Sequence, residues 1–233
     1  EGDPILLIHG FASNSEINWG STGWIKMLVE AGRQVITIDN RGHGASEKLY
    51  DPAAYEAPEM AEDSRRLLDH PATENADVMG YSMGARITTF LAINRPERVR
   101  RAVVAGMAGT MFKGVETSEA ISDALLADNI DEIDLPAAQA FRLFADRTGG
   151  DRRALAACMR AGRPALSHDV LATISCPVLV VAGDEDTIAG PVDPLVEAIP
   201  GAAGLTLPGR DHMKAVGDMT YKRGAIAFLN SGH

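Results

Sequence analysis

The chain has 233 residues, of which 45% are hydrophobic and 23% charged, and its formal net charge is −10 at pH 7. These values are typical of one globular domain with a large core and room for an inserted subdomain. The excess of carboxylates disfavours nucleic acid and anionic membrane surfaces as partners, because both carry charge of the same sign. Every apolar run is shorter than the roughly 18 residues that a membrane span requires.

The cysteine content of the chain bears on its cellular compartment, and its first residues bear on whether further residues lie upstream. Cys158 and Cys176 are too few for a disulfide framework, so a reducing cytoplasm is the simplest compartment. No signal-peptide pattern is evident. The chain begins at Glu1, without a methionine, and enters a predicted strand almost at once. We therefore expect further residues upstream of it.

The first half of the chain alternates apolar runs with segments of helical spacing. Strands are expected at residues 4–8, 34–38, 99–105 and in the run before Ser82, and helices at 24–31, 58–69 and after Ser82. This alternation predicts an α/β fold with a mostly parallel, doubly wound sheet and right-handed crossovers. Active sites of such sheets lie at the carboxyl ends of the strands. His9, Asp39 and Ser82 all follow such ends.

The pattern changes at about residue 107. Helical segments then follow one another without an intervening strand, at 118–127, 135–146, 152–160 and 167–173. We interpret residues 107–173 as a helical lid, inserted into an α/β core formed by residues 1–106 and 174–233. Acidic residues from Glu116 to Asp134 predict a solvated lid face, with substrate selection by charge as the alternative. The sheet resumes with strands at 177–182 and 203–207 and helices near 191–199 and 214–229.

The strongest chemical signal is the pattern G-Y-S-M-G at residues 80–84, between an apolar run and a helical segment. A turn this tight leaves no room for a Cβ atom beside Ser82, which accounts for Gly80 and Gly84. The turn projects the hydroxyl outward, toward the first free N–H groups of the helix. The same stretch therefore predicts a nucleophile and part of an anion site. The alternative, a chance match to a short pattern, is disfavoured by its place between strand and helix.

A serine nucleophile needs a base, and histidine suits that task. His212 follows the last predicted strand through a Pro-Gly turn and so falls at the correct edge of the sheet. We predict that it is the base. Structural roles are expected for the remaining histidines: His9, His43, His70, His168 and His233.

The imidazolium formed during attack needs a carboxylate to orient and stabilise it. The loop after residue 182 offers acidic residues, whereas the loop after residue 105 offers none. Asp211 adjoins His212 in sequence and is poorly placed to hold the same ring. We predict Asp186 as the acid and keep Asp184 as the alternative.

Two backbone N–H groups are expected to form an oxyanion hole, those of Met83 and Phe11. Four residues in the segments around the site are expected to line an apolar pocket for the acyl group. For those beyond residue 106, ordinary core packing is the alternative. The four residues are Trp19, Met107, Met111 and Phe112.

Together these motifs resemble the α/β-hydrolase family over nearly the whole chain. They are H-G-F at 9–11, D-x-R-G-x-G-x-S at 39–46, G-Y-S-M-G at 80–84, G-x-x-D at 183–186 and G-x-x-H at 209–212. The resemblance implies a serine hydrolase with the triad Ser82, His212 and Asp186, and a structural role for 39–46. The family usually begins with an antiparallel hairpin, which is absent here and again indicates residues upstream.

Departures from relatives within the fold narrow the expected activity. Haloalkane dehalogenases and epoxide hydrolases use an aspartate nucleophile, and carbon–carbon bond hydrolases usually carry Gly-Pro-Gly where residues 12–14 read Ala-Ser-Asn. What remains resembles a carboxylic ester hydrolase acting on a small molecule, with lactonase or thioesterase action as close alternatives. A ligand receptor with little turnover is the alternative from another functional class.

No cofactor or metal is expected. Residues 184–189 lack the third ligand and the glycine of a calcium loop, and residues 42–47 lack the last glycine of a dinucleotide-binding fingerprint.

Overall fold

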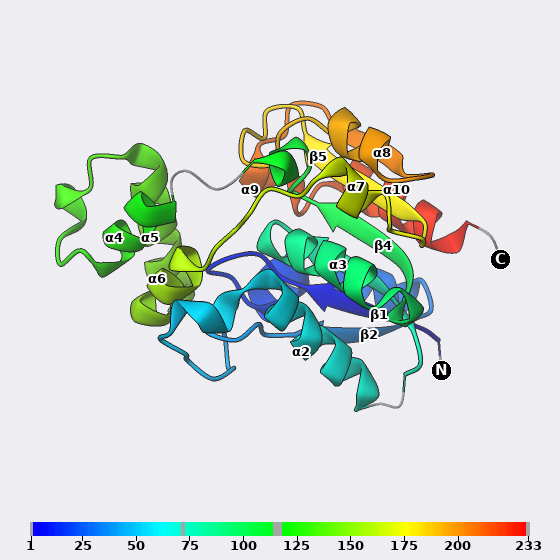
Figure 1. Cartoon of the computed structure of the whole chain (residues 1–233), viewed down its shortest axis with the longest axis horizontal. Coiled ribbons are helices and arrows are strands. Elements are labelled where there is room, and N and C mark those ends of the chain that lie inside the picture. The colour runs from blue at the N-terminus through cyan, green and yellow to red at the C-terminus, as the bar shows by residue number, and fades with distance from the viewer. Residues whose placement is uncertain (1, 71–72, 114–117, 232–233) are drawn as a thin grey trace.

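Six parallel strands of the described residues form one sheet, which confirms the predicted α/β fold. The computed structural model describes residues 2–70, 73–113 and 118–231 (Figure 1). The sheet has the order β2-β1-β3-β4-β5-β6. Its strands are β1 (Asp3–Ile8), β2 (Arg33–Ile38), β3 (Ala76–Tyr81), β4 (Val99–Ala105), β5 (Val178–Gly183) and β6 (Ala203–Leu207).

The strand order reverses direction between β1 and β3. From β1 the chain crosses to β2 on one side, whereas from β3 it crosses to β4 on the other. The loops that leave β1 and β3 therefore diverge and open a crevice at the carboxyl edge of the sheet. Ile8 and Gly80 are register partners at this edge, so the residues that follow them begin side by side.

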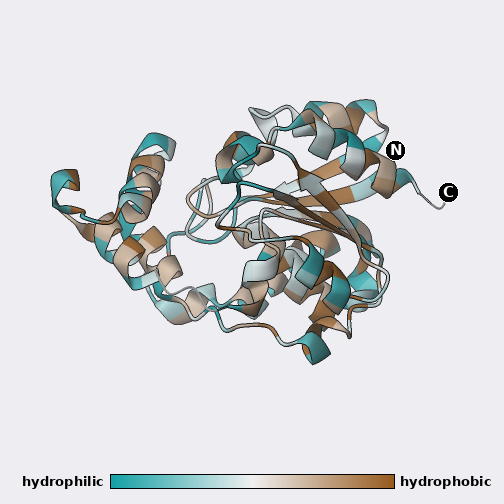
Figure 2. Cartoon of the chain, turned by 90° about the horizontal axis from the view of Figure 1, so that it is seen from above, coloured by the Kyte–Doolittle hydropathy of each residue, from teal (hydrophilic) through white to brown (hydrophobic). Residues whose placement is uncertain are grey.

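Helices cover both faces of the sheet, because successive side chains of each strand point to opposite faces. In β1, Leu6 and Ile8 join one buried cluster, and Ile5 and Leu7 join the other. Figure 2 shows the apolar strands between the two helical layers. One cluster includes side chains of α2 (Ala57–Asp69), α3 (Met83–Asn94) and α8 (Asp193–Ala198), and the other those of α1 (Trp24–Glu30) and α10 (Met219–Asn230).

The helical lid lies between β4 and β5 in sequence and projects beyond the sheet (Figure 1). It contains α4 (Ser118–Leu126), α5 (Pro136–Thr148) and α6 (Arg152–Arg160), and the short helix α7 (His168–Leu171) leads back to the sheet. The buried residues Ile121, Leu125 and Leu155 belong to the same cluster as Leu6. The lid therefore packs against the α/β core.

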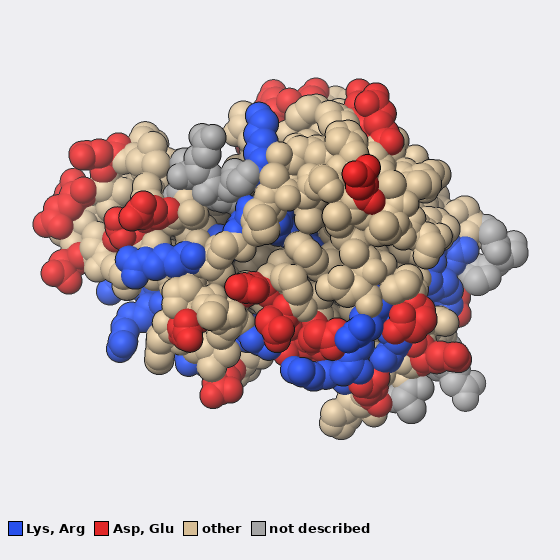
Figure 3. All heavy atoms as spheres, viewed as in Figure 1, with Lys and Arg blue, Asp and Glu red and all other residues tan. Residues whose placement is uncertain are grey.

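The acidic side chains of the lid gather on its outer end, as Figure 3 shows. The described acidic residues of the 116–134 segment are all exposed: Glu119, Asp123, Asp128, Asp131, Glu132 and Asp134. Glu116 lies outside the described residues. This exposure agrees with the solvated face expected from the sequence.

The prediction of one terminal helix over residues 214–229 is wrong. Two helices occur there, α9 (His212–Ala215) and α10, and each begins at an aspartate that caps it. Asp211 accepts hydrogen bonds from the N–H groups of Met213 and Lys214, and Asp218 accepts them from the next helix. An Asp at the N-cap satisfies N–H groups that have no partner within the helix. The break sets His212 at the start of its own short helix.

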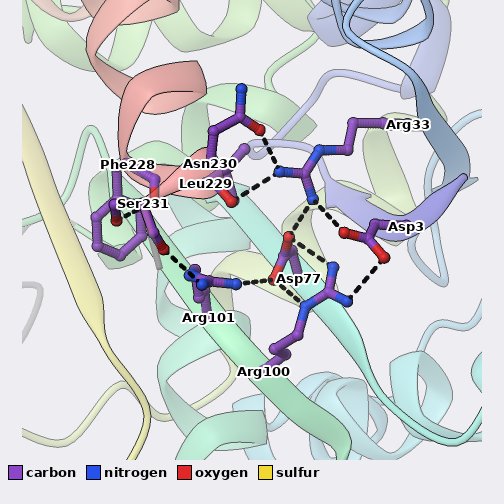
Figure 4. A network of polar contacts seen from close by, with 9 residues as sticks. All are labelled: Asp3, Arg33, Asp77, Arg100, Arg101, Phe228, Leu229, Asn230 and Ser231. Carbon is purple, nitrogen blue, oxygen red and sulfur yellow. Dashed lines mark hydrogen bonds and ion pairs between the residues drawn. The ribbon is translucent and has the colours of Figure 1, made fainter. Parts of the chain in front are cut away.

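A charged network closes the opposite edge of the sheet (Figure 4). The Asp77 carboxylate is fully buried and lies 2.6 Å from Arg33 Nη1 and 2.9 Å from Arg100 Nε. Arg33 also donates to the Leu229 carbonyl, which ties the end of α10 to β2 and β3. This network lies at the amino ends of the strands, away from the crevice. None of the described helices combines the length and apolarity needed to cross a bilayer.

Candidate active site

Ser82 stands in a strained turn between β3 and α3. Its φ and ψ are 55° and −115°, in a region that non-glycine residues rarely adopt. A Cβ atom on Gly80 would lie 2.1 Å from the Gly84 carbonyl oxygen, and one on Gly84 would lie 1.9 Å from that of Ile8. The Ser82 N–H donates to the Ala105 carbonyl at 2.7 Å. Both glycines are thus required by close backbone approach, as the sequence predicted.

Three side chains from distant segments meet above this turn. His212 Nε2 lies 3.0 Å from Ser82 Oγ, and His212 Nδ1 lies 2.8 Å from Asp186 Oδ2. The other Asp186 oxygen accepts hydrogen bonds from the N–H groups of Ile188 and Ala189. The Asp186 side chain is fully buried, whereas His212 is 13% exposed. A hydroxyl, an imidazole and a fixed carboxylate are therefore connected in series.

The two other candidate carboxylates have different partners. Asp184 Oδ1 accepts from the Gly209 N–H at 2.7 Å and so joins the β5 and β6 loops. Asp211 caps α9, where a bond from Lys214 is the main reason that its pKa is lowered. Of the acids considered from the sequence, the structure places Asp186 against the His212 ring.

The loop after β1 is held next to Ser82. A Cβ atom on Gly10 would lie 3.3 Å from Ser82 Cβ, so the two segments are in contact. The Gly10 N–H donates to Asn18 Oδ1 at 3.0 Å. Among the described residues, no hydrogen-bond acceptor takes up the N–H of Phe11 or that of Met83. Both N–H groups therefore lack a described protein acceptor, as the predicted oxyanion hole requires.

His9 holds the loop after β1 in place through hydrogen bonds. Its Nδ1 donates to the Gly10 carbonyl at 2.7 Å, and its Nε2 accepts from the Asn40 N–H at 3.0 Å, which defines the tautomer. Burial lowers the pKa of His9 to about 4 and that of His43, whose ring lies 5.3 Å away, to about 3. Asp39 accepts hydrogen bonds from the Ser15 N–H and hydroxyl. These residues therefore hold loops together, in keeping with the structural roles expected of them.

A cavity of about 530 Å³ opens above Ser82 and His212. Its roof is one face of α5, on which Ala137, Phe141 and Phe144 recur at helical spacing. The edge of the Phe141 ring packs against Phe11, with ring centroids 5.8 Å apart. This volume suits a small organic molecule, and its walls are mostly apolar. No three His, Cys, Asp or Glu side chains among the described residues are grouped so that they could hold a metal ion.

Comparison with known proteins agrees with this geometry. Residues 3–134 match the family model described as alpha/beta hydrolase fold, which is more than half of the chain. The chain belongs to the α/β-hydrolase fold family. Among the curated relatives of this chain, 2-hydroxymuconate semialdehyde hydrolase from Pseudomonas sp. (strain CF600) is 35% identical over 120 residues, covering 52% of this chain and 42% of that protein.

A second relative, 3-oxoadipate enol-lactonase 2 from Acinetobacter baylyi, is 30% identical over 173 residues, covering 68% of this chain and 64% of that protein. The matched region thus spans less than two thirds of either relative. Two solved structures share the fold over 99% of this chain and 93% of their own chains. They are an esterase from Exiguobacterium antarcticum (TM-score 0.81, 20% identity) and a bromoperoxidase from Bacillus anthracis (TM-score 0.80, 24% identity).

The four residues proposed from sequence for the acyl pocket do not line the cavity above Ser82. Trp19 is fully buried, with its ring against Trp24 on the face covered by α1 and α10. Met111 is fully buried in the other cluster, where Met107 also packs, and Phe112 stacks on His168.

The backbone after β4 explains this placement. The N–H groups of Ala108 and Thr110 donate to the Ala189 carbonyl, and that of Gly109 donates to the Pro191 carbonyl. These bonds draw the segment toward the loop after Asp186 and away from the space above Ser82. The roof of the cavity is formed instead by α5. The sequence showed that this helix has an apolar face, but it did not show what that face would contact.

Tyr81 and Asn18 also reach the site, and the sequence reasoning missed both. The Tyr81 hydroxyl donates to the backbone carbonyl of His212, and the two rings are 5.3 Å apart. Burial raises the pKa of Tyr81 well above its usual value, so it remains a donor. Tyr81 occupies a variable position of the G-x-S-x-G pattern, and Asn18 lies in a polar segment without periodicity. Neither position carried a signal of its own.

Proposed function

We propose that this protein is a serine hydrolase that cleaves small carboxylic esters through an acyl-enzyme. The observation that carries the proposal is the connected series of Ser82, His212 and Asp186, set beneath a mostly apolar cavity. A serine hydroxyl is a weak nucleophile at neutral pH, and a histidine within hydrogen-bond distance provides the base that it needs.

In the first step, Ser82 Oγ attacks the ester carbonyl while His212 Nε2 takes its proton. The resulting imidazolium keeps its Nδ1–H bond to Asp186, whose second oxygen is held by two backbone N–H groups and cannot turn away. The N–H groups of Phe11 and Met83 stabilise the oxyanion. His212 then returns the proton to the leaving alcohol.

In the second step, water resolves the acyl-enzyme. His212 takes a proton from the water as it attacks, and the same two N–H groups stabilise the second oxyanion. The carboxylic acid departs as Ser82 Oγ recovers its proton. Besides the ester and one water molecule, this cycle uses the side chains of Ser82, His212 and Asp186 and the N–H groups of Phe11 and Met83.

The test is hydrolysis of p-nitrophenyl butyrate by the wild-type protein and by Ser82→Ala. Steady release of p-nitrophenol that falls by about 10³-fold or more in the variant supports the proposal. A fluorophosphonate should transfer its phosphonyl group, with loss of fluoride, to the peptide that contains Ser82 and to no other. Undiminished turnover in Ser82→Ala would refute it.

Lactone hydrolysis is the second candidate, since one relative is an enol-lactonase. It would use the same residues, with the hydroxyl leaving group remaining attached to the acyl chain. A panel of esters, lactones and thioesters of similar size separates these activities by kcat/KM. A single slow burst without turnover would instead indicate a ligand receptor.

For the compartment we propose the cytoplasm, because the two thiols are unpaired. Cys158 and Cys176 are both free and buried, and burial raises the pKa of each thiol to about 11. Such thiols are poorly reactive, and reducing surroundings would keep them so.

A further inference from the structure

Arg147 is the one arginine or lysine among the described residues that line the cavity above Ser82. It lies in the last turn of α5, on the same helical face as Phe144 and Phe141, which form the roof. The next residue, Thr148, donates its hydroxyl hydrogen bond to the Ala12 carbonyl at 2.7 Å. This bond fixes the end of α5 against the loop that carries Phe11. Arg147 is thereby held near the end of the cavity where the oxyanion hole lies.

The guanidinium of Arg147 has no hydrogen-bond or ion-pair partner within the described ranges. The carboxylates nearest to it in sequence are already engaged. Asp146 lies 2.9 Å from Arg142 Nε and 3.9 Å from Arg152 Nε. Asp151 caps α6 by accepting from two backbone N–H groups. A positive charge therefore borders an apolar cavity, and no described carboxylate neutralises it.

We propose that Arg147 binds a carboxylate of the substrate, so that this enzyme prefers esters carrying a negative charge remote from the scissile carbonyl. The proposal rests on the ester hydrolysis proposed above and names the substrate class of the same site. A guanidinium presents paired N–H donors that match the two oxygens of a carboxylate. Because Arg147 is exposed, water and salt screen part of this attraction.

The other explanation for Arg147 is local. A cation in the last turn of a helix interacts favourably with the helix dipole, whatever the substrate. That role would affect the stability of α5 and would not distinguish charged from neutral esters. The two roles therefore separate in a comparison of matched substrates.

The experiment compares esters that differ only in charge. On the acyl side, mono-p-nitrophenyl adipate is paired with the p-nitrophenyl ester of adipamic acid, which has the same length and no charge. On the alcohol side, 4-carboxyphenyl hexanoate is paired with 4-carbamoylphenyl hexanoate. Each pair reports whether a carboxylate is favoured and on which side of the ester bond it lies.

The variants are Arg147→Gln, which removes the charge, and Arg147→Lys, which keeps the charge without the planar pair of donors. For the anionic ester of the preferred pair, Arg147→Gln should lower kcat/KM by about 5- to 20-fold, at and below the low end of the range for hydrogen bonds to charged groups because Arg147 is exposed. The loss should fall mainly on KM. Arg147→Lys should recover part of it, and the neutral ester should change by less than about twofold.

Arg152→Gln is the matched control. It makes the same change in charge at the start of α6, at a residue outside the cavity lining. It should leave the preference for the anionic ester intact. Raising the salt concentration should weaken that preference in the wild-type protein and have little effect in Arg147→Gln.

Three results would overturn the proposal. They are an equal loss on charged and neutral esters in Arg147→Gln, an equal loss of preference in Arg152→Gln, or no preference for a carboxylate in the wild-type protein. The failure of ester hydrolysis itself looks different. In that case neither member of either pair is turned over in a manner that depends on Ser82.

Discussion

Replacing Asp186 by asparagine tests the central geometry of the site with little disturbance to the fold. Asp186 Oδ1 accepts the N–H groups of Ile188 and Ala189, and an amide oxygen can keep both bonds. The amide NH₂ then faces His212 Nδ1 in place of Oδ2. It can only donate there, so the ring proton moves to Nε2, and the nitrogen beside Ser82 can no longer accept a proton.

The size of the effect follows from this change of tautomer. A wrong tautomer in a serine triad costs about 10⁴-fold in kcat, equivalent to about 5.5 kcal/mol of activation free energy. We expect Asp186→Asn to lower kcat for p-nitrophenyl butyrate by about 10³- to 10⁴-fold. KM and the melting temperature should change little.

Asp184→Asn is the matched control, two residues earlier in the same loop. Its Oδ1 accepts only the Gly209 N–H, a bond that asparagine can retain, and kcat should stay within about threefold of wild type. The reasoning is refuted if Asp186→Asn keeps more than a tenth of the activity, or if the two variants lose equal amounts.

Three further predictions concern positioning and stability. Tyr81→Phe removes the hydrogen bond to the His212 carbonyl and should lower kcat by about 2- to 10-fold at unchanged far-UV circular dichroism; an unaltered kcat would contradict a positioning role. Asp77→Asn leaves the buried Arg33 and the half-buried Arg100 without this carboxylate and should lower the free energy of unfolding in urea by about 3 kcal/mol, with normal kcat per folded molecule. Because burial lowers the pKa of His9 to about 4 and of His43 to about 3, the unfolded chain binds protons between about pH 6.5 and 4 that the folded protein does not. The free energy of unfolding should therefore fall as pH drops through this window, by on the order of 3 kcal/mol for His9 alone, and a flat profile would contradict this assignment.

Features that depend on neighbouring residues were predictable from the sequence. Strands β4 and β6 occur at the predicted residues. Each can be recognised from a few consecutive residues, either as an apolar run or because it follows a turn. The turn at Ser82 was predictable for the same reason, because Gly80 and Gly84 indicate that there is no room for a Cβ atom beside Ser82. The break between α9 and α10 had a local signal in Asp218, an N-cap residue, which the prediction of one long helix overlooked.

The cavity could not be predicted in this way, because its walls come from segments far apart in the chain. Helical spacing shows that Phe141 and Phe144 share one face of α5, yet it does not show whether that face covers the core or a substrate. Backbone bonds from residues 108–110 to the loop after Asp186 decide that Met111 packs into the core. Periodicity along a chain specifies which side of an element avoids water. What lies against that side depends on how all the elements pack together, and only the folded chain settles it.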